Sequence, residues 1–305
     1  MQKKNTVLCF GEILWDNLPD GKKPGGAPMN VAYHLHQLGI DSRLLSSVGH
    51  DEPGKELLAF LQEMGLDTQY IQIDEQHDTS QVQATIEEST HEVTYEIVKP
   101  VAWDFINWQP AFETLVREAQ ALVFGTLSIR NQSSRDTLFR LIEQAEYCVF
   151  DVNLRAPHYT MELIELLLQK AELVKLNSSE LLLIAQHYQP HCVTEADSVE
   201  LLFERFNMEE VLITKGSKGV SYYTTAFRYD YPAYTITVAD TIGSGDSFLA
   251  AFLAMKLADE PIEITLDYAL AMGAFITSQH GACPPYKRFD LDRFIWKKKL
   301  NLDTI

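Results

Sequence analysis

The chain has 305 residues, of which 46% are hydrophobic and 22% charged, and its formal net charge is −18. This composition is typical of a soluble globular protein, and no apolar run approaches the roughly 20 residues that cross a bilayer. The negative charge disfavours nucleic-acid and anionic-membrane partners, because affinity for those surfaces depends on clustered lysines and arginines.

The N-terminal segment and the cysteines both suggest a cytoplasmic protein. The apolar run at residues 6–10 is too short for a signal-peptide core and leads into Gly11 and Glu12 without a small-residue cleavage site. The cysteines form no CxxC pair and show no histidine spacing typical of a zinc site: Cys9, Cys148, Cys192 and Cys283. We therefore expect reduced thiols in the cytosol.

Apolar runs alternate along the chain with segments of helical period. The runs rich in β-branched residues predict strands at residues 6–10, 43–48, 121–124, 147–152, 173–176 and 211–214. The helical-period segments predict helices at residues 28–38, 53–64, 133–143, 161–170, 178–187, 195–206, 247–257 and 264–278. This alternation predicts a mostly parallel sheet covered by helices on both faces.

One region interrupts the alternation. Residues 80–87 and 92–98 alternate apolar and polar side chains around a polar turn at 88–91, which predicts a β-hairpin. A hairpin inserted into a parallel α/β domain has a half-exposed face, which suits a lid over a ligand or a dimer contact. An ordinary edge hairpin would give the same pattern, so the pattern alone leaves both interpretations open.

The first glycine-rich motif is GGAPMN at residues 25–30, at the start of the first predicted helix. Backbone at a glycine pair can lie flat against a sugar. Asn30 can donate and accept hydrogen bonds, and Asp16 offers a carboxylate to a pair of hydroxyls. A simple turn before a proline-started helix is the alternative.

Residues 49–56, GHDEPGKE, match the GxxxxGK part of a phosphate-binding P-loop. Glu56 stands where that motif requires serine or threonine, and Asp51 and Glu52 would repel phosphates. No GxGxxG opens a helix after the first strand either. The sequence therefore disfavours both a P-loop and a dinucleotide-binding fold.

The most informative motif is DTIGSGD at residues 240–246, directly before an apolar helix. Its glycines allow a tight turn, and the free N–H groups at a helix N-terminus suit a phosphoryl group. Asp246 would stand beside this anion site, where its carboxylate could accept a proton from an attacking hydroxyl. The alternative is a glycine-rich turn in which the aspartate caps a helix.

With these motifs the sequence resembles the ribokinase-like (pfkB) carbohydrate kinases over essentially its whole length, and bacterial fructokinases most closely. The family-like features occur in the expected order: residues 10–12 with Asp16, 25–32, 48–49 with Asp51 and Gly54, 151–155, 175–177 with Glu180, 214–216 with Gly219, 240–246 and 281–282. The resemblance implies one ribokinase-like three-layer α/β domain over residues 1–305, with a small β-hairpin lid formed by about 12–24 and 80–100. It also implies transfer of the ATP γ-phosphoryl group to a sugar hydroxymethyl group.

The resemblance assigns roles to individual residues. Asp246 would be the general base, and the anion hole would be formed by Gly243, Ser244 and Gly245. The sugar would be bound by Asp16, Gly26, Asn30, Asn153 and Arg155. Asn153 and Arg155 follow a strand, at the end where ligands collect in open α/β sheets. For Arg155, a surface ion pair is an alternative role.

The cofactors implied are ATP, Mg²⁺ and a monovalent cation, K⁺. The nucleotide would be bound by Asn177, Thr214, Lys215, Gly216, Gly219, Thr241, Ser278 and Gly281. Asn177 and Glu180 would hold Mg²⁺ through water, although the same pair also fits a helix-capping box. Asp240 is the candidate ligand for the monovalent cation, and Pro284 and Pro285 occupy the stretch where relatives commonly supply a further oxygen.

The predicted acceptor is D-fructose, with fructose 6-phosphate as the product, because fructokinases tend to show the Gly-Gly-Ala-Pro form. Ribose, adenosine or another ketose are alternatives, since pocket shape depends on lid residues such as Val82, Gln83 and Tyr95. A sugar-binding regulator without catalysis is a further alternative, although such a protein would not need Asp246 within an intact Gly-Ser-Gly turn. A homodimer through the lid follows by analogy with the family.

Overall fold

The computed structural model describes residues 5–18, 21–86 and 93–300. The strands of its central sheet are β1 (Thr6–Phe10), β4 (Asp41–Gly49), β5 (Ile71–Asp74), β8 (Ala121–Gly125), β9 (Cys148–Asp151), β10 (Leu173–Asn177), β11 (Glu210–Thr214), β12 (Val220–Thr224) and β13 (Arg228–Tyr231). Their order is β13-β12-β11-β10-β9-β8-β1-β4-β5. Neighbours from β5 to β11 pair in parallel, and β12 and β13 add an antiparallel edge.

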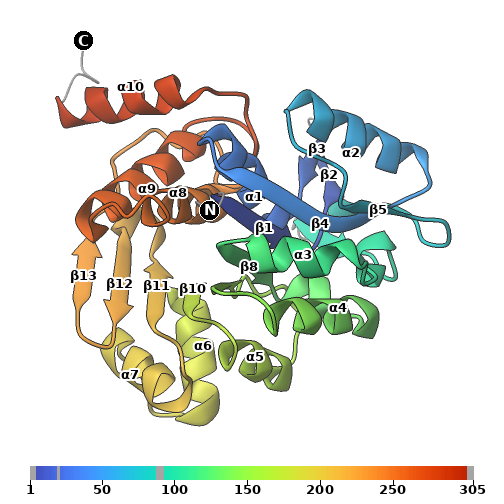
Figure 1. The fold of residues 1–305 in the computed structure, drawn as a ribbon. Coiled ribbons are helices and arrows are strands. Elements are labelled where there is room, and N and C mark those ends of the chain that lie inside the picture. Colours follow the sequence, from blue (N-terminus) through green and yellow to red (C-terminus); the bar gives the residue numbers. More distant parts are fainter. Residues whose placement is uncertain (1–4, 19–20, 87–92, 301–305) are drawn as a thin grey trace.

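Helices cover both faces of this sheet (Figure 1). One face carries α1 (Ala27–Gln37), α8 (Ser244–Lys256) and α9 (Ile262–Thr277), with α2 (Glu52–Glu63) beside them and α10 (Arg288–Lys299) outside α9. The other carries α3 (Ala111–Glu118), α4 (Gln132–Ile142), α5 (Met161–Leu168), α6 (Ser178–Tyr188) and α7 (Glu195–Arg205). None of the helices in the described ranges combines the length and apolarity needed to cross a membrane.

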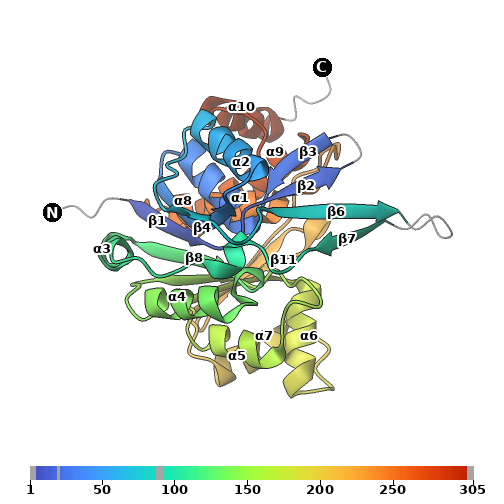
Figure 2. The same cartoon turned by 90° about the vertical axis from the view of Figure 1, so that its right-hand side faces the viewer.

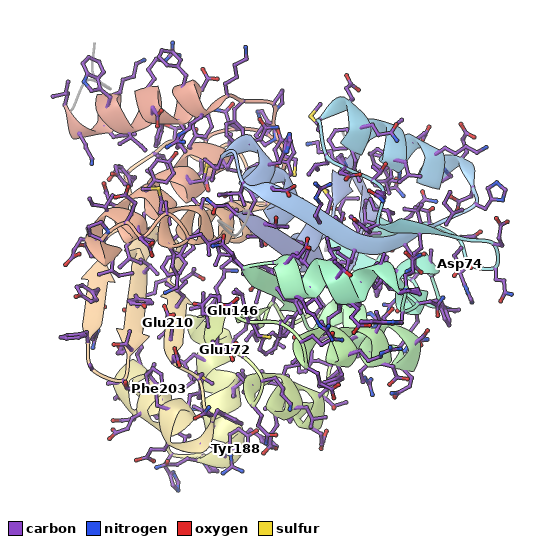
Figure 3. The ribbon with its side chains drawn as sticks, in the orientation of Figure 1. Asp74, Glu146, Glu172, Tyr188, Phe203 and Glu210 are labelled. Carbon is purple, nitrogen blue, oxygen red and sulfur yellow. The ribbon has the colours of Figure 1, made fainter. Side chains whose placement is uncertain are left out.

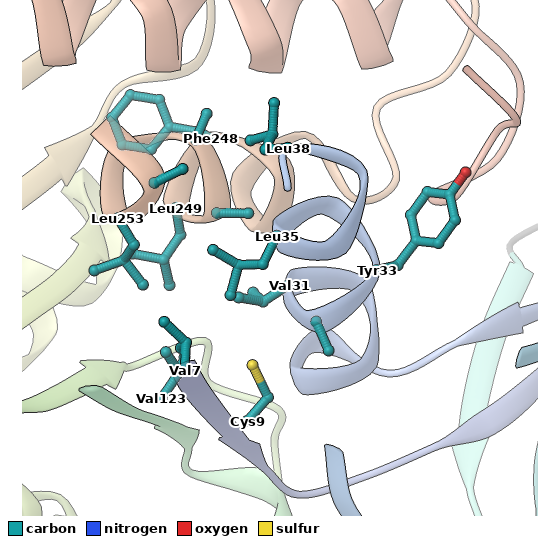
Figure 4. Close-up of a cluster of buried hydrophobic side chains, with 14 of the residues drawn as sticks. Val7, Cys9, Val31, Tyr33, Leu35, Leu38, Val123, Phe248, Leu249 and Leu253 are labelled. Atoms are coloured by element: carbon teal, nitrogen blue, oxygen red, sulfur yellow. The ribbon is translucent and has the colours of Figure 1, made fainter. Parts of the chain in front are cut away.

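Each central strand is buried on both faces. In β1, Val7 and Cys9 face α1 and α8, whereas Leu8 and Phe10 face the opposite helical layer. Figure 4 shows the first of these interfaces, where side chains of α1 and α8 pack over β1 and β8. Burial on two faces explains why these strands read as continuous apolar runs and were predictable from sequence.

A second, smaller sheet contains the predicted hairpin. Its strands are β2 (Leu14–Leu18), β3 (Gly21–Gly25), β6 (Ser80–Ile86) and β7 (Val93–Ile97), in the order β3-β2-β6-β7. The antiparallel pairing of β6 with β7 confirms the hairpin, while its predicted turn at 88–91 lies outside the described residues. In Figure 2 these strands extend away from the central sheet.

The structure confirms the predicted three-layer α/β fold with a mostly parallel sheet. The sequence prediction omitted short or polar elements, namely β2, β3, β5, β12, β13, α3 and α10. Strands β3, β5 and β13 are exposed or half-buried at most positions, and Leu291 is the buried residue of α10, so the apolar signal of these elements is weak. Strand β12 is buried at four consecutive positions and was missed all the same.

Acidic side chains gather at the amino ends of β9, β10 and β11 (Figure 3). Glu210 accepts hydrogen bonds from the hydroxyls of Tyr147 and Tyr222 and pairs with Lys256 at 2.9 Å. Glu172 accepts the backbone N–H of Cys148 at 2.6 Å. The carboxylates of Glu172 and Glu210 are thus satisfied by partners within the fold.

Candidate active site

A cavity of about 700 Å³ lies where the carboxyl ends of the parallel strands meet the smaller sheet. Its wall includes Glu12 after β1, Leu127 after β8, and Asn177 and Thr214 at the ends of β10 and β11. The chain runs outward from β1 through β4 and β5, then returns to form β8 on the other side of β1. Ligands of open α/β sheets bind at such a reversal of strand order.

The cavity brings together most of the predicted site residues. Those in its wall are Asp16, Gly26, Asn30, Asn153, Arg155, Asn177, Glu180, Thr214, Thr241, Gly243, Gly245 and Asp246. Those that lie outside its wall are Lys215, Gly216, Gly219, Asp240, Ser244, Ser278 and Gly281. The two glycine motifs therefore meet in one cavity, whereas five of the eight predicted nucleotide-binding residues lie outside its wall.

The contact that joins the two motifs is a hydrogen bond between Asn30 and Asp246. Asn30 Nδ2, on α1, donates to Asp246 Oδ2, on α8, at 2.7 Å. Cys283 Sγ donates to Asn30 Oδ1 at 3.3 Å. This second contact fixes the Asn30 amide with its NH₂ group toward the carboxylate. The predicted base therefore sits in a defined orientation between the helices.

The predicted anion site lies at the N-terminus of α8. Gly243 has φ 73°, and a Cβ there would lie 2.7 Å from Ala282 Cβ, so glycine is required at this turn. The first N–H groups of a helix have no intrahelical acceptor, and that of Ser244 makes only a long contact of 3.4 Å with the Thr241 carbonyl oxygen, so the start of α8 could bind an anion. The Ser244 hydroxyl contacts the Gly273 carbonyl at 3.4 Å, so its side chain faces α9.

A buried ion pair lies beside the anion site. Lys175 Nζ donates to the two carboxylate oxygens of Asp151 at 2.9 and 2.8 Å. Nζ also lies 3.2 Å from where a Cβ of Gly245 would stand. Burial raises the pKa of Asp246, while Lys175 and the hydrogen bond from Asn30 oppose that rise. The Lys175 ammonium therefore favours the ionised form of Asp246, and it lies close to the predicted anion site.

Glu12 is a wall residue to which the sequence interpretation gave no role. It is 3% exposed, and its Oε2 lacks a hydrogen-bond partner among the described residues. Burial raises the pKa of Glu12 to about 7, with Arg155 opposing the rise and Asp246 adding to it. A carboxyl group directly after a buried strand was the available signal for this residue.

The backbone of Glu12 also explains why residue 26 is glycine. Gly26 has φ 116°, and a Cβ there would lie 2.3 Å from the Glu12 carbonyl oxygen. Beside the neighbouring Gly25, burial raises the pKa of Asp16, and Arg155 opposes that rise. Carboxyl groups and one guanidinium thus surround the end of the cavity that adjoins the smaller sheet.

Asn177 and Glu180 form the capping box that was the alternative interpretation of this pair. Asn177 Oδ1 accepts the N–H of Glu180 at 2.9 Å, and Glu180 Oε2 accepts the N–H of Asn177 at 2.8 Å. Glu180 Oε1 accepts the N–H of Leu154 at 2.8 Å. Their oxygens suit a hard cation such as Mg²⁺ reached through water. The described residues contain no ready-made cluster of histidine, cysteine or carboxylate ligands.

Three of the predicted nucleotide-binding residues have contacts within the fold that explain their residue types. Lys215 Nζ pairs with Glu195 at 2.8 Å, so its amine faces α7 rather than the cavity. Gly219 has φ 101°, and a Cβ there would lie 1.9 Å from the Tyr231 carbonyl oxygen. Ser278 Oγ donates to the Phe275 carbonyl at the end of α9 at 2.7 Å.

Asp240 holds two loops together. Its Oδ1 accepts the N–H of Ile242 and its Oδ2 accepts the N–H of Gly281, each at 3.0 Å. Both carboxylate oxygens therefore contact backbone. This arrangement anchors the anion-site turn against the loop that follows α9.

Known proteins share the sequence pattern and the fold. The family model for the pfkB family carbohydrate kinases matches residues 16–288. The fructokinase of Klebsiella pneumoniae is 30% identical over 94% of this chain and 98% of its own. A fructokinase with bound ATP from Xylella fastidiosa superposes with a TM-score of 0.85 at 22% identity, over 97% of this chain and 99% of that one.

A second solved structure is the fructokinase of Vibrio cholerae O395 with fructose, ADP and calcium. It has a TM-score of 0.80 at 25% identity and covers 95% of this chain and 98% of its own. These matches extend across both sheets and the cavity between them. The family expected from the glycine motifs is confirmed, and the chain belongs to the pfkB family of carbohydrate kinases.

Proposed function

We propose that this protein transfers the γ-phosphoryl group of ATP to the 6-hydroxymethyl group of D-fructose, giving fructose 6-phosphate and ADP. The observation that carries the proposal is the 2.7 Å hydrogen bond between Asn30 and Asp246. It brings a hydroxyl-binding helix, a candidate base and a helix N-terminus into one cavity. The similarity to a bacterial fructokinase at 30% identity and to a fructokinase solved with fructose supports this choice of acceptor.

The proposed reaction is an in-line displacement. The sugar hydroxyl oxygen attacks the γ-phosphorus, Asp246 takes the hydroxyl proton, and ADP leaves as the bond to the β-phosphate oxygen breaks. The N–H groups of Gly243, Ser244 and Gly245 stabilise charge on the transferred group. Mg²⁺ would neutralise phosphate charge when bound, and the residues that would hold it through water are Asn177 and Glu180.

The remaining assignments extend this proposal. ATP would lie between the anion site and the wall formed by Asn177, Thr214, Lys215, Gly216, Gly219, Thr241, Ser278 and Gly281. Asp240 would take part in a K⁺ site next to the anion hole. We further propose a cytoplasmic enzyme with one domain over residues 1–305, in which the smaller sheet acts as a lid and as a homodimer contact.

The charges of the cavity favour a neutral acceptor. Glu12, Asp16 and Asp246 contribute carboxyl groups, Lys175 is already paired with Asp151, and Arg155 adds a single guanidinium beside them. Carboxylates repel an anionic sugar, whereas they accept hydrogen bonds from the hydroxyls of a neutral one. A free sugar therefore fits this cavity better than a sugar phosphate or a sugar acid.

We expect the kcat/KM for fructose to exceed that for ribose, glucose or adenosine by about tenfold or more, because a site built to pair particular hydroxyls rejects ligands that leave its polar groups unpaired. ADP release measured across these acceptors at saturating ATP gives the ratios. A higher kcat/KM for ribose or adenosine would replace fructose as the substrate and leave the kinase assignment intact.

A further inference from the structure

The loop from Gly49 to Gly54, which resembles a P-loop in sequence, packs against the start of β6. A Cβ at Gly49 would lie 2.6 Å from the Thr79 nitrogen and 2.7 Å from the His77 carbonyl oxygen. A Cβ at Gly54 would lie 2.4 Å from the Gly49 carbonyl oxygen and 2.7 Å from Thr79 Oγ1. Both glycines are therefore required because the chain around Thr79 fills the space beside them.

Asp51 holds Thr79 from the centre of this loop. Its Oδ2 accepts the Thr79 N–H at 2.7 Å, and its Oδ1 accepts the Thr79 hydroxyl at 2.6 Å and the Gly54 N–H at 2.8 Å. Thr79 Oγ1 in turn accepts the Gly49 N–H at 2.8 Å. We call these four residues the Asp51–Thr79 clamp.

The clamp contains an ionised carboxylate. Partial burial opposes ionisation of Asp51, but the hydrogen bonds from Thr79 and Gly54 lower the pKa of its carboxyl group below the usual value. Hydrogen bonds to an ionised acceptor are shorter and stronger than neutral ones. Thr79 itself is 3% exposed, so water competes little for these contacts.

The same loop also holds the strand next to β6. Trp15, in β2, donates its indole N–H to the Pro53 carbonyl at 2.9 Å. Strands β2 and β6 are parallel neighbours, with Asp16 opposite Val82, and both of these residues line the cavity. The loop thus fixes β2 one residue before Asp16 and fixes β6 three residues before Val82.

We propose that Asp51 and Thr79 are positioning residues that set the lid strands β2 and β6 for closure over the acceptor sugar. The inference rests on the proposed kinase function. When the clamp holds the strands, they close over the bound sugar, and the sugar hydroxyl occupies the position next to the γ-phosphorus in place of water. When they loosen, a water oxygen attacks the γ-phosphorus instead. The bond from the γ-phosphorus to the β-phosphate oxygen breaks, Asp246 takes a proton from the water, and the products are ADP and inorganic phosphate. The clamp therefore determines how ATP partitions between sugar and water.

Asp51→Asn separates this role from helix capping. The remaining carbonyl oxygen can still accept the Gly54 N–H at the start of α2, whereas the new NH₂ group meets the Thr79 N–H, donor against donor. Thr79→Val removes the hydroxyl from the other side, and Thr79→Ser keeps it. The matched control is Glu52→Gln in the same loop, where the exposed carboxylate contacts Lys55 at 3.4 Å.

The test measures inorganic phosphate and sugar phosphate formed from ATP and fructose. We expect the ratio of hydrolysis to sugar phosphorylation to rise about tenfold or more in Asp51→Asn and Thr79→Val, with a higher KM for fructose. Thr79→Ser and Glu52→Gln should stay within about twofold of the wild-type ratio. A destabilised fold alone would lower the amount of active enzyme without changing this ratio.

Hydrogen–deuterium exchange of the β6 amides in the free protein gives a second readout that needs no acceptor. Faster exchange in both clamp variants, together with the raised ratio, supports the proposal. Unchanged exchange, or faster exchange with an unchanged ratio, overturns it. If the wild type phosphorylates none of the sugars, the proposed function fails, and the exchange data still decide whether the clamp holds the strands.

Discussion

Replacing Asp246 with asparagine should lower kcat by about 10²- to 10⁴-fold, which is the usual contribution of a positioned acid–base group. Asp246→Asn removes the proton acceptor while its amide oxygen can still accept the hydrogen bond from Asn30. The KM for the sugar should change little, because the hydroxyl-binding groups remain. Steady-state kinetics with fructose, together with a thermal melt of each protein, measure this effect.

The pH dependence gives a further check on this base. Burial raises the pKa of Asp246, so kcat/KM should fall as the pH drops through that raised value and protonates the carboxylate. Glu12, with a pKa raised to about 7, titrates in the same cavity, and Glu12→Gln separates the two groups. A loss in kcat below about fivefold would mean that Asp246 is not the base and that its carboxylate only holds α1 against α8 through Asn30.

The second large effect is expected at Lys175. Lys175→Met should destabilise the fold by about 3–5 kcal/mol, because it leaves Asp151 as a buried charge without a partner. Urea unfolding at 25 °C measures this loss. The double variant Lys175→Met/Asp151→Asn should recover most of it, since no unpaired charge then remains.

The same substitution should also change the pH profile. The positive charge of Lys175 lowers the pKa of Asp246, so its removal should move the acidic limb of kcat/KM to higher pH. A single variant as stable as the wild type would show that the ion pair contributes nothing to the fold. An unmoved acidic limb would show that Lys175 does not act on the base.

Local sequence signals predicted the parts of the site that depend on backbone shape. Gly26 and Gly243 have positive φ and no room for a Cβ, so glycine at these turns carries information that a single sequence reveals. The contact between the two glycine motifs could not be predicted from their local pattern, because Asn30 and Asp246, which form it, are 216 positions apart in the chain. Spacing along the chain contains no information about which strand ends become neighbours.

Charged residues inside apolar strands were the main omissions. Lys175 lies within β10 and Asp151 ends β9. Both belong to stretches that resemble the family, but the sequence interpretation gave neither residue a role. Their pairing depends on the parallel register of β9 and β10, in which Lys175 lies opposite Asp151. Glu12 was missed for a similar reason, since only the folded cavity shows that its carboxyl group lacks a partner.

For the P-loop-like segment at residues 49–56, the sequence excluded one role but did not suggest the role that the structure shows. Sequence reasoning rejected phosphate binding there because Asp51 and Glu52 are acidic, but it had no other role to offer. The structure shows that Asp51 binds the chain at Thr79, a residue 28 positions away. A carboxylate that disqualifies one motif can thus be explained by a distant hydrogen-bond partner, which only the folded chain identifies.

The central claim is that the cavity transfers phosphate from ATP to the hydroxymethyl group of fructose. The most direct test incubates the purified protein with ATP, Mg²⁺ and fructose and identifies the products by ³¹P and ¹³C NMR. The account predicts ADP and fructose 6-phosphate in equal amounts, with phosphorus coupled to C6 of the sugar. Formation of ADP without a sugar phosphate, or phosphorus on a ring hydroxyl instead of a hydroxymethyl group, would contradict it.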